Sequence, residues 1–423
     1  MAKIIIGALP ITGELSPLLQ LARGLAGRGH QVTVVTGSQF RPRVEDLGLA
    51  FTPVTGLADF GARLLGEDPE RARLAPGPEM LNYDCIRNFV DPMPELHAVL
   101  QRLLEQDPGQ YLISNVQWLG ALPTALGAPG LRPLKWVAVS AIPLFLSSDD
   151  TTFFGPIPAG PGEDGKAANR AANAQFAMAM QPTQDRLAEV LESLGATQDC
   201  PVFTDAIYTV PDVAAALTVP GFEFERSDAP DSLHLVGVLP ASSAADWQPP
   251  HWWADLDGSR PVVVVTQGTI ANQDLSELIE PALAGLADLD VIVVAALGRE
   301  VSALSVPVPA NARVAEFLPF DKLLPKADVY LTNGGLGGTQ QAIAAGVPVI
   351  VAGLTEDKPG VAARAAYHGL GINLQTATPT SEAVTAAVQS VLKDDEMRDN
   401  VRKLAQVYAA YDPLTEIEQL TLA

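Results

Sequence analysis

The segment LTNGGLGGTQQAIAAGVPV (331–349) holds four glycines within five positions: Gly334, Gly335, Gly337 and Gly338. An apolar, strand-like run (329–332) leads into it and a stretch with helical spacing follows. Glycines at a strand end let backbone amides approach a ligand, and the first turn of a helix adds unpaired N–H groups and a positive dipole. We therefore expect a phosphate site here. The alternative is a glycine-rich turn that only permits tight packing of helix on strand.

Two common phosphate-binding motifs do not fit this segment. A Walker P-loop needs a Gly-Lys-Ser/Thr sequence after its first glycines, and the segment has no such lysine. A dinucleotide fingerprint needs Gly or Ala where Gln341 stands. A nucleotide-diphosphate site remains, with one wall supplied by each of two domains.

Three further groups follow strands in the same half of the chain. Two hydroxyls around a glycine could contact phosphate from another side, an aromatic ring could stack on a base, and three charged side chains could bind sugar hydroxyls. The hydroxyls and glycine are Thr266, Gly268 and Thr269, and the aromatic ring is Phe317. The charged side chains are Glu356, Asp357 and Lys358.

The elements that must position these residues alternate between strand and helix. The run KIIIGAL (3–9) is continuously apolar after its first residue, which is typical of a parallel strand buried on both faces. We expect a helix with Ser16 as N-cap and Pro17 at its first position, closed by Gly29, and then a strand at 31–37. Such βαβ units predict an α/β fold with a doubly wound parallel sheet.

The alternation restarts after an irregular segment (239–260), which we interpret as an interdomain linker. Two other stretches, 75–95 and 147–170, are rich in Pro, Gly and polar residues, and we expect them to be loops. Beyond the linker we expect strands at 261–265, 291–297, 329–332 and 347–353, and helices at about 274–288, 339–345, 359–368 and 381–393.

Composition narrows the class of protein. The 423 residues carry a formal net charge of −22, which argues against nucleic acid and anionic membranes as partners. No stretch approaches the ~20 apolar residues of a membrane span, so we expect no integral membrane segment. The two cysteines, Cys85 and Cys200, lie too far apart in the sequence for a metal-ligand motif, and they favour a cytoplasmic location.

With the glycine-rich segment and the three further groups in this order along the chain, residues 261–375 closely resemble the donor-binding domain of the macrolide/UDP-glycosyltransferase family. Its members are inverting GT-B enzymes common in bacterial natural-product glycosylation. The resemblance extends to residues 1–55. It implies two facing Rossmann-like domains around a deep interdomain cleft, with a nucleotide-diphosphate sugar as donor substrate and no metal or other cofactor. The implied parts are an acceptor domain (1–238), a linker (239–260), a donor domain (261–405) and a C-terminal helix that packs back on the first domain (406–423).

The resemblance also assigns donor contacts. Phe317 would stack on the base, the Leu318 backbone would pair with the base edge, and Gln341 stands where the family usually has a Glu that holds the ribose. Asn333 replaces the usual His on a phosphate and can donate a hydrogen bond but no charge. The remaining donor candidates are Gly13 and the diphosphate-lining residues Gly335, Gly337, Gly338 and Thr339.

The charged triplet after the strand at 347–353 departs from the family in one residue. Asp357 and Lys358 match the usual Asp-Gln pair that reads the sugar. The lysine could signal an altered sugar preference, or it could merely pair with Glu356 or Asp357.

The most consequential departure concerns the catalytic base. The family commonly has Gly-His-x-x-Pro after the first strand, whereas this chain has GELSP (13–17). Glu14 could replace the His as general base. Alternatively, Glu14 only places a negative charge near a helix N-terminus, or the base is another group or absent. Where an Asp often orients the His, this chain has Asn115, which cannot ionise.

The resemblance thus implies an inverting, metal-independent transfer of a hexose from UDP-glucose or a dTDP-sugar to a hydroxyl of a small apolar acceptor, by a monomer or homodimer. An auxiliary protein that binds nucleotide sugars without turnover is the alternative, and an epimerase would need acidic and His groups that we do not find around the sugar. Acceptor candidates, for which core packing is the competing role, are Tyr83, Phe89, Phe145, Phe153 and Phe154.

Overall fold

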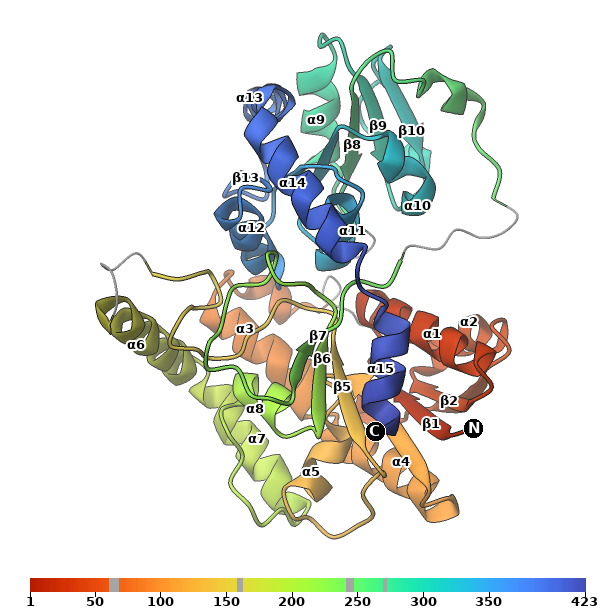
Figure 1. Ribbon diagram of the computed structural model, residues 1–423, viewed down its shortest axis with the longest axis vertical. Helices are drawn as coiled ribbons and strands as arrows, with labels where there is room; N and C mark the ends of the chain where they lie inside the picture. The colour runs from red at the N-terminus through yellow and green to blue at the C-terminus, as the bar shows by residue number, and fades with distance from the viewer. Residues whose placement is uncertain (61–67, 158–162, 241–246, 269–271) are drawn as a thin grey trace. The chain divides into compact units, whose positions relative to one another are not determined.

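The computed structural model describes residues 1–60, 68–157, 163–240, 247–268 and 272–423 (Figure 1). The chain divides into two compact units, each built around one parallel β-sheet. Unit 1 comprises Met1–Leu217, Glu225–Leu239 and Asp412–Ala423, and unit 2 comprises Thr218–Phe224 and Pro240–Tyr411.

The sheet of unit 1 has the strand order β3-β2-β1-β4-β5-β6-β7, and its neighbouring strands are parallel. Strand β1 is apolar after Lys3 because Ile5 joins the core on one face while Ile4 and Ile6 join the core on the other. The strands are β1 (Lys3–Gly7), β2 (Gln31–Thr36), β3 (Ala50–Pro53), β4 (Gln110–Asn115), β5 (Trp136–Ser140), β6 (Val213–Ala216) and β7 (Leu233–Leu235).

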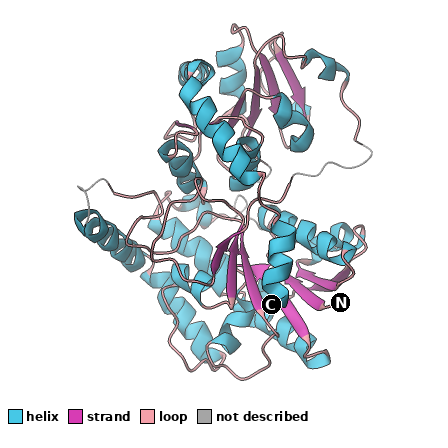
Figure 2. Cartoon of the chain, in the orientation of Figure 1, coloured by secondary structure: helices cyan, strands magenta, loops and turns pink. Residues whose placement is uncertain are grey.

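Helices pack on both faces of this sheet (Figure 2). The C-terminal helix α15 lies against α1, where Leu414 occupies space beside Gly24: a Cβ on that glycine would lie 2.6 Å from a Leu414 methyl. The helices of unit 1 are α1 (Thr12–Gly27), α2 (Arg41–Glu45), α3 (Pro78–Cys85), α4 (Met93–Gln106), α5 (Leu122–Ala125), α6 (Glu163–Ala179), α7 (Gln181–Ser193), α8 (Phe203–Thr209) and α15 (Pro413–Leu422).

The sheet of unit 2 has the order β10-β9-β8-β11-β12-β13 and is also parallel. Both orders reverse direction at a central pair, β1/β4 and β8/β11, and ligands of such sheets bind beyond the carboxyl ends of the strands at that point. The strands are β8 (Val262–Thr266), β9 (Ile292–Ala296), β10 (Ala312–Ala315), β11 (Val329–Thr332), β12 (Val349–Val351) and β13 (Gly371–Asn373). The helices are α9 (Ile279–Leu286), α10 (Phe320–Leu323), α11 (Leu336–Ala344), α12 (Lys358–Tyr367), α13 (Ser381–Lys393) and α14 (Asp395–Tyr408).

No helix that the structure describes is long and apolar enough to cross a bilayer. Both cysteines are free thiols, and burial raises the pKa of each to about 12. Thiols with such pKa values are largely protonated near neutral pH and are poor nucleophiles.

The predicted loop 75–95 is wrong over most of its length, and the predicted loop 147–170 is wrong from residue 163 onward. The stretch 75–95 contains α3, a π-helical turn (Ile86–Val90) and the start of α4, and the stretch 147–170 contains the first turns of α6. Helix α6 is held by amide side chains: Asn169 donates to the Asp149 carbonyl at 3.0 Å, and Asn173 donates to the carbonyls of residues 148 and 151. Polar anchoring of this kind leaves no apolar period for a sequence pattern to reveal.

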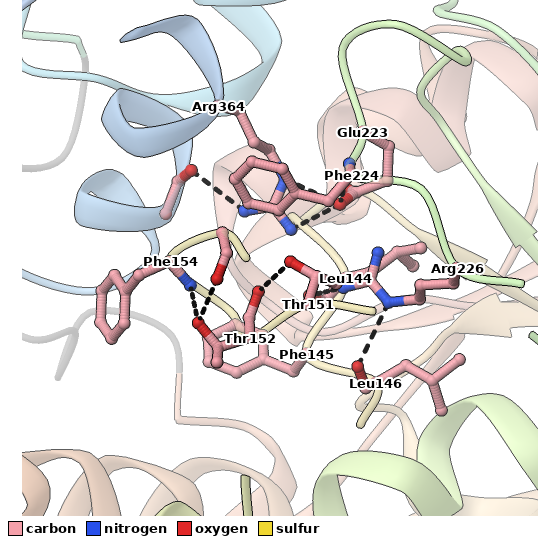
Figure 3. A network of polar contacts seen from close by, with 12 residues as sticks. Leu144, Phe145, Leu146, Thr151, Thr152, Phe154, Glu223, Phe224, Arg226 and Arg364 are labelled. Atoms are coloured by element: carbon pink, nitrogen blue, oxygen red, sulfur yellow. Dashed lines mark hydrogen bonds and ion pairs between the residues drawn. The ribbon is translucent and has the colours of Figure 1, made fainter. Parts of the chain in front are cut away.

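The segment Thr218–Phe224 lies within the predicted acceptor domain (1–238) but packs within unit 2. Arg364 of α12, which is 0% exposed, donates from Nε and Nη2 to Glu223 Oε1 at 2.9 and 2.6 Å (Figure 3). Its guanidinium carbon lies 4.5 Å from the centroid of the Phe224 ring. The division predicted from the sequence placed this segment in the domain 1–238. No local pattern could indicate that Glu223 forms a buried ion pair with Arg364, 141 positions away.

The buried pair predicts a large cost for removing one partner. We expect Glu223→Gln to lower the free energy of unfolding by about 3–5 kcal/mol, since the Arg364 charge would stay buried without its counter-charge. Urea denaturation followed by circular dichroism measures the change. Asp399→Ala, which breaks the exposed pair with Arg402, is the control, with an expected loss below about 1 kcal/mol. Equal losses in the two variants would contradict the assignment of the Arg364 pair as a structural anchor of unit 2.

Candidate active site

In unit 1, the predicted base lies where the strand order reverses. Asn115, the last residue of β4, is 0% exposed, and its Nδ2 donates to Glu14 Oε2 at 2.9 Å and to the Glu14 main-chain carbonyl at 3.2 Å. The Asn115 Oδ1 accepts the N–H of Leu9 at 2.8 Å, just beyond β1. The carboxylate of Glu14, itself 8% exposed, is therefore held by a buried amide at the carboxyl ends of β1 and β4.

Helix α1 begins at Thr12, so the predictions of Ser16 as N-cap and Pro17 at the first helical position are wrong. The Ser16 hydroxyl donates to the Thr12 carbonyl at 2.6 Å, and Pro17 lies inside the helix. A helical turn has already formed upstream, because the Glu14 N–H donates to the carbonyl three residues earlier at 3.0 Å. Glu14 thus lies in the first turn of a helix, where the dipole stabilises a negative charge. Gly13 beside it is exposed, with no described atom within 4 Å of where its Cβ would stand.

In unit 2, the two central strands, β8 and β11, are followed by turns of the same kind. The Thr266 hydroxyl accepts the N–H of Gly268 at 3.2 Å, and the Thr332 hydroxyl accepts the N–H of Gly334 at 3.3 Å. The φ angles of the two glycines are +73° and +97°, a left-handed conformation that favours glycine. The prediction from sequence missed Thr332. The repeated pattern Thr-x-Gly at 266–268 and 332–334 was the available signal.

The Asn333 side chain ties these two turns together, since its Nδ2 donates to the main-chain carbonyl of Gln267. Both Asn333 and Thr266 were predicted to contact phosphate. In the structure, the Asn333 amide and the Thr266 hydroxyl hold the loops at the carboxyl ends of β8 and β11. Thr269, also predicted as a donor contact, lies outside the described residues.

The four glycines after β11 divide into two kinds. Gly334 is needed for its left-handed turn, and a Cβ on Gly338 would lie 2.6 Å from the Tyr330 hydroxyl. Gly335 and Gly337, in contrast, are exposed, and no described atom lies within 4 Å of where a Cβ would stand. Backbone conformation and packing therefore explain Gly334 and Gly338, and neither explains Gly335 and Gly337.

These two glycines frame the start of α11, for which Gly335 is the N-cap. The Thr339 hydroxyl is buried and donates to the Gly335 carbonyl at 2.9 Å, so this side chain fixes the turn from within. Gln341 follows on the same helix and is half-buried. After β10, Phe317 exposes 70% of its surface while Leu318 is buried.

The charged triplet after β12 is a local ion pair beside a titratable acid. Lys358 is 6% exposed, and its ammonium contacts the Glu356 carboxylate and lies 3.1 Å from the Thr355 hydroxyl. The structure shows the pairing of Lys358 with Glu356, which was one of the two interpretations of this lysine. Asp357 is half-buried at the N-cap of α12, and burial raises its pKa to about 6.

Three of the five acceptor candidates gather in unit 1. The rings of Phe145 and Phe153 stack with centroids 3.8 Å apart, and Phe154 meets Phe153 edge-on at 5.1 Å. Phe154 is 60% exposed (Figure 3). The other two lie apart: Phe89 packs against the core, and burial together with a 2.7 Å hydrogen bond to an aspartate raises the pKa of Tyr83 to about 12.

Within the described ranges, no three His, Cys, Asp or Glu side chains are placed so that they could hold a metal ion. The charges at the candidate donor residues are the Lys358–Glu356 pair and Asp357, and the neutral donors are backbone amides. This arrangement suits hydrogen bonding to an anion and to hydroxyl groups.

The sequence and the structure were compared with those of known proteins. Residues 280–422 match the family model described as "Erythromycin biosynthesis protein CIII-like, C-terminal domain". UDP-glucosyltransferases B1 and A1 of Starmerella bombicola are 36% and 34% identical, over 97% of this chain and 96% and 90% of their own lengths. The 4'-demethylrebeccamycin synthase of Lentzea aerocolonigenes is 33% identical, over 99% of this chain and 98% of its own length.

Solved structures agree on the fold. The glycosyltransferase of kitacinnamycin superposes with a TM-score of 0.73 at 22% identity, covering 99% of this chain and 97% of that one. Spinosyn rhamnosyltransferase SpnG in complex with spinosyn aglycone gives 0.69 at 22% identity, covering 99% of both chains. The chain therefore belongs to the macrolide/UDP-glycosyltransferase family, as its motifs predicted, and is a glycosyltransferase of GT-B fold.

Proposed function

We propose that this glycosyltransferase moves glucose from UDP-glucose to a hydroxyl group of a small, largely apolar acceptor, with inversion at the anomeric carbon and without a metal ion. One observation carries the proposal: Gly335 and Gly337 leave the backbone bare at the start of α11, on the carboxyl side of β11. The relatives named UDP-glucosyltransferases make UDP-glucose the first donor to test, before a dTDP-sugar.

The donor would lie along the carboxyl edge of the unit 2 sheet. Because all its strands are parallel, the segments after β10, β11 and β12 leave the sheet on one edge. They supply the exposed ring of Phe317 for the base, the bare amides at Gly335 and Gly337 for the diphosphate, and Asp357 for a sugar hydroxyl. Gln341 would hold the ribose.

The negative charge that grows on the departing UDP needs stabilisation. The first N–H groups of α11 have no acceptor within the helix, and the helix dipole adds about half a positive charge at that end. Fixed donors of this kind stabilise a developing anion without reorganisation. They give the transfer a source of charge stabilisation that requires no metal.

Glu14 would act as the general base. Its carboxylate takes the proton of the acceptor hydroxyl, the hydroxyl oxygen attacks the anomeric carbon, and the bond to the diphosphate oxygen breaks with its electron pair leaving on UDP. A single displacement of this kind inverts the anomeric configuration. The helix dipole and the Asn115 amide both favour the ionised carboxylate that the step requires.

The acceptor would contact the aromatic cluster of unit 1. Phe145 and Phe153 are stacked, and Phe154 is largely exposed, so the cluster offers ring faces to an apolar molecule. The solved structure of SpnG, a protein of the same fold, is a complex with spinosyn aglycone, which supports a test of aglycones as acceptors. We further propose that the enzyme works in the cytoplasm as a monomer or homodimer, without nucleic-acid partners.

Removal of the base is the first test. We expect Glu14→Gln to lower kcat by about 10²–10⁴-fold because the amide cannot accept the hydroxyl proton. UDP binding, measured by calorimetry, should stay unchanged. Turnover is measured with radiolabelled UDP-glucose and a panel of phenols, flavonoids and macrolides. Undiminished turnover in the variant would remove Glu14 from this role and leave its charge near the helix N-terminus as its function.

Two neighbouring glycines provide a matched test of the donor site. Gly337→Ala should weaken UDP-glucose binding about tenfold or more, because the methyl group enters the space left for the ligand. The same change should not destabilise the fold, since alanine is favoured over glycine in a helix by about 1 kcal/mol. Gly338→Ala should instead destabilise by about 1–3 kcal/mol through its clash with Tyr330. Loss of stability without loss of affinity in Gly337→Ala would indicate packing rather than binding.

The stereochemistry and the metal requirement are tested on the intact enzyme. We expect turnover to persist in excess EDTA, and proton NMR of the product to show a β-glucoside formed from the α-linked donor. Restoration of lost activity by Mg²⁺ or Mn²⁺ would contradict the metal-free mechanism, and an α-glucoside would contradict inversion.

A further inference from the structure

We propose that Asn115 is the positioning residue for Glu14, and that an amide stands at this place because the base is a carboxylate. The inference rests on the proposed function, in which Glu14 accepts the acceptor proton. It assigns a role to a residue that does not itself touch the reacting atoms.

The geometry assigns both donor bonds of one buried amide to a single residue. Asn115 Nδ2 donates to the Glu14 carboxylate at 2.9 Å and to the Glu14 carbonyl at 3.2 Å, so it fixes the side chain and the backbone together. The Oδ1 is in turn fixed by the Leu9 N–H at 2.8 Å, which prevents the amide from rotating. The orientation of Glu14 is thereby tied to the ends of β1 and β4 rather than to α1 alone.

The residue type follows from the chemistry of its partner. An imidazole base needs a hydrogen-bond acceptor on its second nitrogen, which an acid supplies. A carboxylate base needs a donor, and a second carboxylate 2.9 Å away would share a proton with it and raise its pKa. An asparagine donates without charge, so it orients Glu14 and leaves it ionised.

The groups near Glu14 come from α1, from the strand ends and from α2. Glu14 is the acidic residue in the first turn of α1, and the strand ends contribute the neutral Leu9 amide and Asn115. From α2, the Arg43 guanidinium donates to the hydroxyl of Ser16 at 2.9 Å, two residues beyond Glu14. The Asn115 bond ties the orientation of the Glu14 carboxylate to the sheet.

The test compares Asn115→Asp and Asn115→Ala with Gln110→Ala. Gln110 is a buried amide on the same strand, and it donates to two main-chain carbonyls at the opposite end of β4. We expect Asn115→Ala to lower kcat by about 10–10²-fold with the KM for UDP-glucose unchanged, because the base is misplaced. Asn115→Asp should move the acidic limb of the pH profile of kcat/KM upward by about one unit or more. Gln110→Ala should leave both kcat and the profile unchanged.

A double-mutant comparison separates positioning from general destabilisation. In a Glu14→Gln background, Asn115→Ala should cause no further loss of kcat, since the base that it positions is already gone. An equal loss in both backgrounds would overturn the proposal. So would an unaltered pH profile in a folded, active Asn115→Asp variant, and either result leaves Glu14 as the base and the proposed function intact.

A measurement independent of turnover keeps the two proposals apart. In protein with ¹³C-labelled glutamate carboxyls, the Glu14 resonance is assigned as the signal that Glu14→Gln removes. Its titration should shift upward by about one unit or more in Asn115→Asp. If the wild-type enzyme transfers no sugar, the proposed function fails. The resonance then still decides whether Asn115 controls the carboxylate, and an unshifted titration overturns that inference.

Discussion

The candidate site depends on how parallel strands end. At the central pair of strands in each sheet, the chain leaves the sheet in opposite directions. The last backbone N–H and C=O groups of these strands then need hydrogen-bond partners that the neighbouring strand no longer supplies. In unit 1 Asn115 receives the Leu9 N–H and donates to Glu14, and in unit 2 Asn333 donates to the Gln267 carbonyl. In both sheets an asparagine at or just after the end of the second central strand, β4 or β11, holds the loop that follows the neighbouring strand.

Asn333, Thr266 and Thr339, for which donor contacts were predicted, each have a structural role in these loops. Their polar atoms bond to the backbone, at the Gln267 carbonyl, the Gly268 N–H and the Gly335 carbonyl. A loop fixed in this way presents its backbone amides without needing its side chains to reach the ligand. The side chains shape these loops, and in the proposed function the peptide groups make the contacts with phosphate.

The regular elements were predictable because their signals are local. Strand β11 and helix α13 have the predicted bounds, since apolar runs and helical spacing with a Thr380 cap are readable in a short window. The start of α1 was not, because Ser16–Pro17 matches a helix start while Thr12 forms the first turn. Polar anchoring hid α6, and a contact across 141 positions hid the true place of Thr218–Phe224.

The sequence showed the two departures at Glu14 and Asn115 separately, and they stand 101 positions apart. Only the parallel pairing of β1 with β4 brings them into contact, because it sets the end of one strand beside the loop after the other. A His–Asp arrangement and a Glu–Asn arrangement then satisfy the same geometric rule with the donor and acceptor exchanged. If Glu14 is the base, as proposed, then an exchange of the base alone would leave either two like charges or an unmatched buried polar group, each of which costs free energy. On that proposal, the two departures from the family pattern are one change in the chemistry of the site.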